Sequence, residues 1–488
     1  MTYDLIIIGA GPAGIFAAYE AVKLSPSAKI LILEKGQDIY SRKCPILQGK
    51  KKFCPVPEVS SLAKSLPSAG CLPACSITSG FGGAGAYSDG KFNITTEFGG
   101  WLGEYMPPLK LLELIDYVDS INLAHGAPEQ ITNPNTEAVR LIEQKIYGAG
   151  MRLLRAKVRH LGTEINLQVM KSIFDELKDK VEMRFSTEVT DIITMENKVA
   201  GVLAYAKSSH GKVEGNTDKH CSYQAANVLI APGRDGSAWL ADILSKRGIS
   251  VTCNQVDIGV RAEVSDVIMQ DINCHLYEAK MIFSSSTGAS VRTFCSNPSG
   301  HVVVENHSGI MAANGHAFFD PEYGSNNTNF ALLVSHKFTQ PFNKPNEYAR
   351  EICKRANDLS NGGVIVQRFG DLIRGRRSTD KRIKEGFLEP TLNEAVPGDL
   401  GLVLPYNTLK SIIEATYALD KVTPGFAAEH TLFYGVEAKF YSARPNLNES
   451  LKTEIEGLYC AGDGAGVTRG LAQAGAAGVH VARAIFGV

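Results

Sequence analysis

Three glycines near the start of the chain have the spacing of a phosphate-binding turn. They form the motif Gly9-x-Gly11-x-x-Gly14 and follow an apolar run over residues 3–8, which is typical of a buried parallel strand. In such a turn the first glycine permits the tight bend, the second lets the backbone approach a pyrophosphate, and the third lets the following helix pack on the strand. The start of that helix offers free N–H groups and the positive end of its dipole. The spacing predicts a dinucleotide site whose contacts are Gly9, Gly11, Pro12, Ala13 and Gly14.

An acidic residue follows this motif at the expected distance. Glu34 stands twenty residues after Gly14, at the end of a second apolar run over residues 29–33. A carboxylate there can accept hydrogen bonds from both hydroxyls of a ribose, and it would repel a phosphate on that ribose. We therefore expect a dinucleotide without a ribose phosphate, held by Glu34 and its neighbour Lys35. This motif alone does not separate FAD from NAD, and a glycine turn without a ligand is the alternative.

The end of the chain carries a second strand, turn and helix. The apolar residues 458–461 lead into a turn over residues 462–466 (GDGAG), and a helix rich in small residues follows. Asp463 is placed to bind a ribityl hydroxyl, and the start of the helix can point at the pyrimidine edge of a flavin, where its dipole would stabilise negative charge. This turn, paired with the N-terminal motif, indicates FAD, with contacts from Gly462, Asp463, Gly470 and Ala472.

These features resemble the FAD-dependent oxidoreductases of the glutathione-reductase-like flavoprotein superfamily. The resemblance covers residues 4–36, 226–236 and 457–486, and in such proteins the chain leaves the FAD domain to build a substrate domain and then returns. It implies that Val189 contacts the adenine and that Ala231 and Gly233 belong to a cofactor-binding turn, in which this chain has Ala-Pro-Gly. No attachment signature is visible, so we expect non-covalent FAD, with NAD(P)H as one candidate for a transient electron donor.

A second glycine cluster spans residues 79–91 and reads SGFGGAGAYSDGK. Successive N–H groups in such a segment can form an anion-binding nest. Together with residues 374–378 and the C-terminal segment, the cluster resembles a poorly characterised bacterial group of FAD-dependent dehydrogenases. That resemblance implies a cofactor and an architecture rather than a reaction. It places the cluster against the diphosphate and the flavin ring, through Gly83, Ala84, Ser88 and Asp89; a solvated glycine turn is the alternative.

Three cationic side chains are the catalytic candidates. Lys91 leaves the second glycine cluster, and a positive charge near the ring would raise the reduction potential of the flavin. His160 lies at the end of a predicted strand over residues 152–160 and could move a proton, although a surface or capping histidine is an equally good interpretation. Arg469, just before the last helix, could contact cofactor or substrate. The arginine-rich run 374–377 could clamp a carboxylate or phosphate, but such a run is more often solvated.

Four cysteines stand near the second glycine cluster, at positions Cys44, Cys54, Cys71 and Cys75. Their spacing is not diagnostic of a zinc site or an iron–sulfur cluster. We favour reduced cysteines in a loop and predict no metal, with a metal site and a redox-active pair as alternatives. Cys460, in an apolar strand, is expected in the core.

The composition is that of an ordinary globular protein. The chain has 488 residues, of which 44% are hydrophobic and 21% are charged, with a formal net charge of −1. This balance gives no global attraction to nucleic acid or to an anionic membrane. No uninterrupted apolar stretch is long enough for a membrane span, and no secretion signal is visible. We expect a cytoplasmic protein without integral membrane association, acting on a small-molecule substrate; its oligomeric state is open.

The predicted fold class is α/β. It comprises a Rossmann-like FAD-binding domain that is discontinuous in sequence, an inserted mixed α+β substrate domain and a helical insertion. The predicted boundaries are 1–107, 181–244 and 431–488 for the three parts of the FAD-binding domain, 108–180 for the helical insertion and 245–430 for the substrate domain. The predicted function is a dehydrogenase or reductase that transfers a hydride between FAD and an organic small molecule. The alternatives are a flavin-dependent monooxygenase that uses NAD(P)H and oxygen, and a flavin-binding redox sensor or partner protein without its own turnover.

Overall fold

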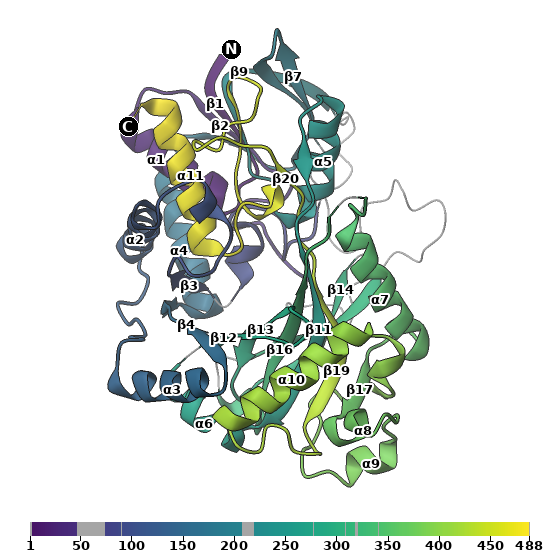
Figure 1. The fold of residues 1–488 in the computed structure, drawn as a ribbon. Helices are drawn as coiled ribbons and strands as arrows, with labels where there is room; N and C mark the ends of the chain where they lie inside the picture. Colours follow the sequence, from purple (N-terminus) through teal and green to yellow (C-terminus); the bar gives the residue numbers. More distant parts are fainter. Residues whose placement is uncertain are drawn as a thin grey trace. The chain divides into compact units, whose positions relative to one another are not determined.

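The computed structural model describes residues 2–45, 74–88, 90–206, 219–276, 278–307, 309–317, 321–339 and 341–487 (Figure 1). The chain forms two compact units. The first unit comprises Met1–Ile131, Lys157–Thr252 and Ser442–Val488, and the second comprises Thr132–Ala156 and Cys253–Tyr441. The mixed α/β architecture with a discontinuous Rossmann-like domain is as the sequence predicts.

The first unit contains helices and strands from both ends of the chain. Its strands are β1 (Thr2–Ile8), β2 (Ile30–Leu33), β3 (Lys91–Ile94), β5 (Lys157–His160), β6 (Glu182–Arg184), β7 (Thr187–Met195), β8 (Lys198–Ala206), β9 (Lys219–Ile230), β10 (Val251–Thr252), β20 (Arg444–Pro445) and β21 (Leu458–Cys460). Its α-helices are α1 (Pro12–Leu24), α2 (Pro108–Ala124), α4 (Gly162–Leu177), α5 (Ser237–Lys246) and α11 (Leu471–Phe486).

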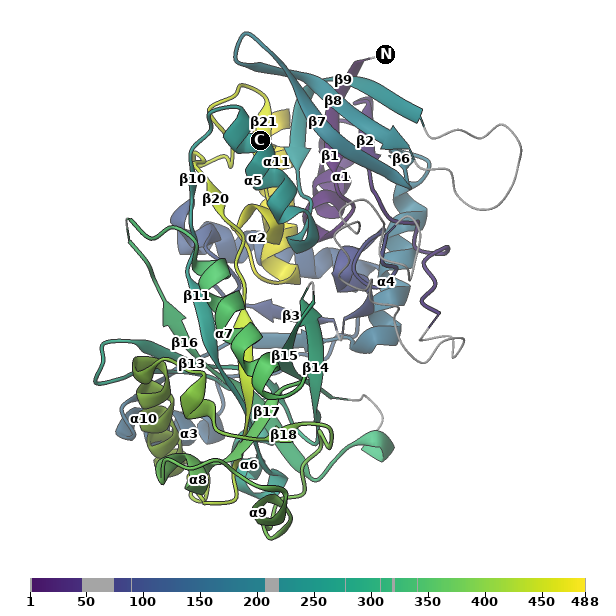
Figure 2. The same cartoon turned by 90° about the vertical axis from the view of Figure 1, so that its right-hand side faces the viewer.

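A seven-stranded sheet forms the centre of this unit, in the order β6-β2-β1-β9-β8-β7, with β21 also paired to β9. β1 pairs in parallel with both β2 and β9, and β21 pairs in parallel with β9. Every residue of β2 is buried, as expected for a parallel strand covered on both faces. Figure 2 shows β7, β8 and β9 continuing the sheet past β1. β1 and β21, which come from opposite ends of the chain, therefore both pair with β9.

Small residues let the first and last helices approach closely. A Cβ atom on Gly478 of α11 would lie 2.0 Å from the carbonyl oxygen of Ala13 in α1, and one on Gly475 would lie 2.9 Å from both Phe16 and Val118. The two helices lie side by side in Figure 1, α1 in purple and α11 in yellow. Only glycine leaves room for this contact, which fixes the starts of both helices relative to the sheet.

The second unit is built on an eight-stranded sheet in the order β18-β17-β19-β11-β16-β13-β12-β4. Its strands are β4 (Met151–Leu154), β11 (Val256–Ser265), β12 (Lys280–Ser284), β13 (Ser290–Asn297), β14 (His301–His307), β15 (Ile310–His316), β16 (Asn327–His336), β17 (Ile365–Arg368), β18 (Val396–Pro397) and β19 (Leu432–Lys439). Its α-helices are α3 (Glu137–Gly148), α6 (Asp266–Asn273), α7 (Pro345–Leu359), α8 (Phe369–Ile373), α9 (Asp380–Lys384) and α10 (Tyr406–Val422).

The central strand β11 separates an apolar face from a charged one. Ile258 and Val260 belong to the apolar core of this unit, together with residues of α7 and α10. The alternate residues Asp257, Arg261 and Glu263 are fully buried on the other face. Because strand side chains alternate between faces, the second face carries a buried polar network, which lies beside a smaller apolar cluster that includes Leu432 and Tyr434 of β19.

The division into units differs from the predicted boundaries in three places, one of which is the main part of the second unit, which begins at Cys253 rather than at 245. The predicted strand over 152–160 is two strands: β4 pairs with β12 in the second unit, and β5 pairs with β3 in the first. α3 also belongs to the second unit, so the segment 108–180 is not one helical insertion. The return to the first unit comes after Tyr441 rather than at 431, because β19 pairs with β11 and β17. These pairings join strands far apart in sequence.

None of the described helices combines the length and the apolar character that a membrane crossing requires.

Candidate functional site

Three turns meet at the carboxyl edge of the first unit's sheet. Parallel strands place their carboxyl ends at one edge, and β1, β9 and β21 each end there in a glycine-containing turn. A Cβ on Gly9 would lie 2.3 Å from the carbonyl oxygen of Ala231, and one on Gly464 would lie 2.2 Å from that of Gly233. The predicted contacts from the start, middle and end of the chain are thus neighbours in space.

The same edge has room for a phosphate-bearing ligand. At Gly11, Gly233 and Gly470 an added Cβ would meet no atom within 4 Å, so the backbone there faces open space. Gly11 and Gly470 are also the N-caps of α1 and α11, and neither helix start is capped by a side chain. Uncapped helix starts present unsatisfied N–H groups and a positive dipole end, which suit a pyrophosphate and the electron-rich edge of a flavin. The residues present therefore fit FAD.

Glu34 has a structural role that the sequence does not reveal. Its carboxylate is buried; Oε2 accepts a hydrogen bond from the N–H of Ala10 at 2.9 Å, and Oε1 accepts from Gly36 at 2.8 Å and from Gly80 at 2.9 Å. A carboxylate offers about four acceptor positions, so three amides leave one, on Oε2. Glu34 therefore ties both glycine turns to the end of β2, and one acceptor position on Oε2 remains for the predicted ribose contact.

The second glycine cluster lies between the other two turns. Residues 83–87 form a short 3-10 helix whose preceding residue, Gly82, donates its N–H to the carbonyl oxygen of Ala10 at 2.8 Å. A Cβ on Gly83 would lie 3.1 Å from the Cα of Gly11, and one on Gly85 would lie 2.6 Å from Leu471. Ala84 belongs to this 3-10 helix, the hydroxyl of Ser88 bonds to Gly85, and Asp89 lies outside the described residues. The cluster thus contacts the starts of both α1 and α11.

Arg42 anchors the second glycine cluster, and no motif pointed to it. Its buried guanidinium donates to the carbonyl oxygens of Ser76, Ile77 and Phe81 at 2.6–2.9 Å and lies over the ring of Tyr87. Burial lowers the pKa of Arg42. A single arginine in a turn-rich segment carries no sequence signal, since its partners are backbone carbonyls that any residue supplies.

Two of the three catalytic candidates are direct neighbours. Lys91 and His160 are paired residues of the antiparallel strands β3 and β5, so their side chains lie on the same face. β3 also packs against α11, which begins directly after the segment that holds Arg469. The N–H of Arg469 donates to the carbonyl oxygen of Gly99 at 2.6 Å, so a loop from the N-terminal part fixes the start of α11.

At the end of β2, Lys35 forms an ion pair with Asp235, which follows β9. Because β2 and β9 flank β1 in the sheet, this ion pair spans the carboxyl end of β1. Val189 is buried in β7, two residues after Thr187, whose N–H donates to the carbonyl oxygen of Glu34 at 2.9 Å. The end of β2 is thereby attached to the segment predicted to contact the adenine.

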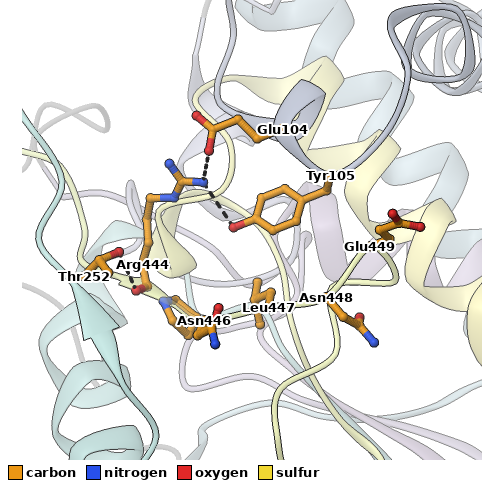
Figure 3. Close-up of a pocket in the computed structure, with 9 residues that line it drawn as sticks. Glu104, Tyr105, Thr252, Arg444, Asn446, Leu447, Asn448 and Glu449 are labelled. Atoms are coloured by element: carbon orange, nitrogen blue, oxygen red, sulfur yellow. Dashed lines mark hydrogen bonds and ion pairs between the residues drawn. The ribbon is translucent and has the colours of Figure 1, made fainter.

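A pocket of about 500 Å³ opens elsewhere in the first unit (Figure 3). The lining residues come from the segments around Glu104 and Tyr105 and from Thr252 and residues 444–449. Arg444 donates through Nη2 to Glu104 at 2.6 Å and to the Tyr105 hydroxyl at 3.1 Å. None of these residues was singled out from the sequence, because the pocket joins three segments that are distant in the chain.

The arginine-rich run 374–377 lies in the second unit and is bound to carboxylates of its own chain. Arg374 pairs with Glu429, and Arg376 bonds through Nε to Asp371 at 2.7 Å. Two of the three guanidinium groups in this run therefore already have acidic partners. The binding of a substrate carboxylate or phosphate by the run stays a hypothesis.

Asp371 makes stability in this region pH-dependent. Burial opposes its ionisation, but hydrogen bonds from Ser378 and Arg376 and the charge of Arg382 hold its pKa below the usual value. Ionised Asp371 therefore stabilises the fold above the unfolded-state pKa, and this stabilisation is lost as the pH falls through the lower folded-state pKa. We expect Asp371→Asn to lower the free energy of unfolding at neutral pH by about 1–3 kcal/mol. Denaturant titrations at several pH values measure this effect, and the difference in unfolding free energy between variant and parent should shrink below about pH 3.9. A difference that stays constant with pH would contradict the lowered pKa of Asp371.

The described cysteines are all reduced, and burial raises the pKa of Cys460 to about 12, as expected for a core thiol. Among the described residues no group of three or more histidine, cysteine or acidic side chains is arranged to hold a metal ion. Cys54 and Cys71 lie outside the described residues, so the alternatives for the four-cysteine segment stay predictions.

Comparison with known families decides the cofactor. Residues 3–243 match the family model described as pyridine nucleotide-disulphide oxidoreductase, and residues 257–440 match the one described as FAD-dependent protein, C-terminal domain-like. This chain is an FAD-dependent oxidoreductase. The two matches correspond to most of the first unit and most of the second, in agreement with the fit of the glycine edge to FAD.

No curated protein matches this oxidoreductase. Solved structures resemble it only distantly. They include formate oxidase of Aspergillus oryzae (12% identity, 99% of this chain and 98% of the other covered, TM-score 0.46) and pyridoxine 4-oxidase of Mesorbium loti (11%, 99% and 99%, TM-score 0.43). Quinol fumarate reductase of E. coli has 14% identity over 100% of this chain and 70% of its own, with a TM-score of 0.42. Similarity at this level supports no statement about the substrate.

Proposed function

We propose that this oxidoreductase is a dehydrogenase or reductase that transfers a hydride between non-covalently bound FAD and an organic small molecule. We also propose that it belongs to the glutathione-reductase-like group and acts in the cytoplasm. The observation that carries the proposal is the meeting of three glycine turns and two uncapped helix starts at one sheet edge. That arrangement suits one extended dinucleotide.

The chain's own residues would hold the cofactor along this edge. The start of α1, with Gly11, takes the pyrophosphate; the free acceptor position of Glu34 takes a ribose hydroxyl; and Asp463 takes the ribityl chain. Asp463 is held for this task, because its Oδ1 accepts a hydrogen bond from the Thr468 hydroxyl at 2.8 Å. Bound FAD supplies hydride transfer at its ring nitrogen.

Three cationic residues would act on the substrate side. The start of α11 and Lys91 place positive potential where negative charge develops, which favours the reduced state. His160, opposite Lys91 on the strand pair, holds or releases the proton that accompanies the hydride. Arg469 would orient cofactor or substrate from the loop before α11.

The first test is spectroscopic. The purified protein should carry the visible absorption of an oxidised flavin, released intact by denaturation if the FAD is non-covalent. Anaerobic mixing with NADH, NADPH and a panel of organic donors should bleach this band for at least one of them. Colourless folded protein that ignores added FAD would refute cofactor binding. Oxygen uptake coupled to a hydroxylated product would instead establish a monooxygenase, and a flavin that no donor reduces would favour a redox sensor.

The assignment of Lys91 predicts a change in potential. Lys91→Gln removes a positive charge beside the ring and should lower the two-electron reduction potential of the bound FAD by roughly 30 mV, equivalent to about 1.4 kcal/mol. Equilibration with redox dyes in a spectrophotometer measures this shift. Lys157→Gln is the matched control, because Lys157 lies at the other end of the same strand pair, opposite Ile94. Equal potentials in both variants would remove Lys91 from the flavin site.

A further inference from the structure

An ion pair joins two segments that flank the cofactor edge of the first unit. Lys35 comes directly after Glu34, which has an acceptor position left for the predicted ribose contact. Asp235 comes two residues after Gly233, where an added Cβ would meet no atom within 4 Å. The Lys35 ammonium and the Asp235 carboxylate are in direct contact. Each partner therefore belongs to a segment that the proposed FAD site uses.

This ion pair connects two strand ends that are not neighbours in the sheet. β2 ends at Leu33 and β9 ends at Ile230, and β1 lies between them. Adjacent strands are about 4.8 Å apart, so the two strand ends are separated by roughly 10 Å along the edge. The side chains of Lys35 and Asp235 bridge this distance across the carboxyl end of β1, where the turn at Gly9 begins.

The ion pair is open to solvent, whereas the glycine turn beneath it is not. The side chain of Lys35 is 30% exposed and that of Asp235 is 60% exposed, while Ala10 in the turn is fully buried. An exposed ion pair is weak, because water solvates both partners and salt screens their attraction. Exposed side chains also change rotamer within nanoseconds. This bridge can therefore open and re-form easily, unlike the buried contacts of Glu34.

We propose that Lys35 and Asp235 form a clasp across the edge that holds FAD. The clasp is closed both before and after FAD binds, and it opens when the cofactor enters or leaves. The proposal rests on the FAD site proposed above. Because the ion pair is broken only while FAD passes, its removal lowers the barrier to entry and the barrier to release by the same amount. The clasp therefore controls how fast FAD exchanges and leaves the equilibrium affinity unchanged.

A direct contact between Lys35 and the cofactor, which the sequence predicts, has different consequences. With such a contact, Lys35→Gln would speed the release of FAD and weaken its binding. Asp235→Asn would free the Lys35 ammonium for the cofactor, and binding would become stronger or stay the same. With a clasp, both substitutions break the same ion pair and act alike. Asp235→Asn is therefore the variant that separates the two interpretations.

The test measures both rate constants of FAD exchange in the parent, in Lys35→Gln, in Asp235→Asn and in the double variant. Stopped-flow quenching of flavin fluorescence gives the association rate constant, and the fluorescence recovered after dilution of the FAD-loaded protein gives the dissociation rate constant. Each single variant should raise both rate constants by about two- to fivefold, as expected for the loss of an exposed ion pair, with an unchanged dissociation constant. The double variant should be no faster than either single variant, because each substitution already breaks the pair. Added salt should speed release from the parent more than from the variants.

Lys452→Gln is the matched control. Lys452 pairs with Glu456 at 3.0 Å, and their side chains are 28% and 62% exposed, close to the values for the two residues of the clasp. Glu456 stands just before β21, at the amino edge of the same sheet, so this pair lies away from the cofactor edge. Lys452→Gln should exchange FAD at the rates of the parent.

Three results would overturn the clasp. They are rate constants equal to those of the parent in both single variants, faster release in Lys35→Gln alone, and an equal acceleration by Lys452→Gln. Thermal denaturation of the same variants identifies a purely structural pair, which would lower stability and leave the exchange rates unchanged. The parent protein keeps the two proposals apart: if it binds FAD but the variants exchange it at the same rates, only the clasp is refuted. If the folded parent binds no FAD, both proposals are refuted.

Discussion

Gly11→Ala is expected to leave the oxidoreductase folded and to weaken FAD binding roughly ten- to a hundredfold. Gly11 has an ordinary φ of −79°, and a Cβ there meets no protein atom within 4 Å, so alanine fits the fold without strain. The new methyl group would occupy the space in which a pyrophosphate approaches the backbone. Loss of one or more hydrogen bonds to a charged group, each worth about 1.5–3 kcal/mol, gives the expected size. Titration of apoprotein with FAD, followed by quenching of flavin fluorescence, measures the affinity.

Gly14→Ala is the contrasting variant within the same motif. A Cβ on Gly14 would lie 2.0 Å from the carbonyl oxygen of Gly9, so the turn and α1 must separate. We expect a loss of at least about 1–3 kcal/mol in the free energy of unfolding, as for an overpacked core, even without FAD. Thermal denaturation of both apo variants separates the two effects. Unchanged FAD affinity in Gly11→Ala would exclude Gly11 from the phosphate site.

The cofactor edge was predictable because each part of it is local. A strand, a glycine turn and a helix within about 30 residues have a characteristic pattern, and both the turn at Gly9–Gly14 and the one at 462–466 could be recognised alone. Parallel pairing then brings such turns to one edge, whatever lies between them in the sequence. The prediction that both ends of the chain share one sheet needed no knowledge of the intervening residues.

The parts that were missed depend on contacts between distant residues. The separation of β4 from β5 follows from their different partners, β12 and β3, which leave no mark on the sequence of 151–160. The anchoring of glycine turns by Glu34 and Arg42 uses backbone groups, which are the same in every residue. Arg444 was missed for a similar reason, since the acid and rings that orient it lie about 340 residues away.

The buried charged face of β11 gives the largest expected effect on stability. Arg261 and Glu437 are fully buried and form two hydrogen bonds, from Nε to Oε2 at 2.8 Å and from Nη2 to Oε1 at 2.9 Å. The remaining partners of Arg261 are neutral oxygens, including those of Asn314 and Asn329. Glu437→Leu therefore leaves a buried guanidinium without a counter-charge and should lower the free energy of unfolding by about 3–5 kcal/mol. Denaturant titration followed by circular dichroism measures it.

The double variant Arg261→Met with Glu437→Leu separates the cost of an unpaired charge from the loss of the pair. It removes both buried charges. Lys439, which contacts Glu437 at 3.0 Å in the parent, loses its partner, but its side chain is 14% exposed and can extend toward water. The double variant should therefore be more stable than Glu437→Leu alone. If the losses of unfolding free energy from the two single substitutions simply added up in the double variant, the coupling energy between Arg261 and Glu437 would be zero. The stability of this buried face would then come from packing. Glu137→Leu, which breaks the exposed pair with Arg140, should change stability little, because water already solvates both groups.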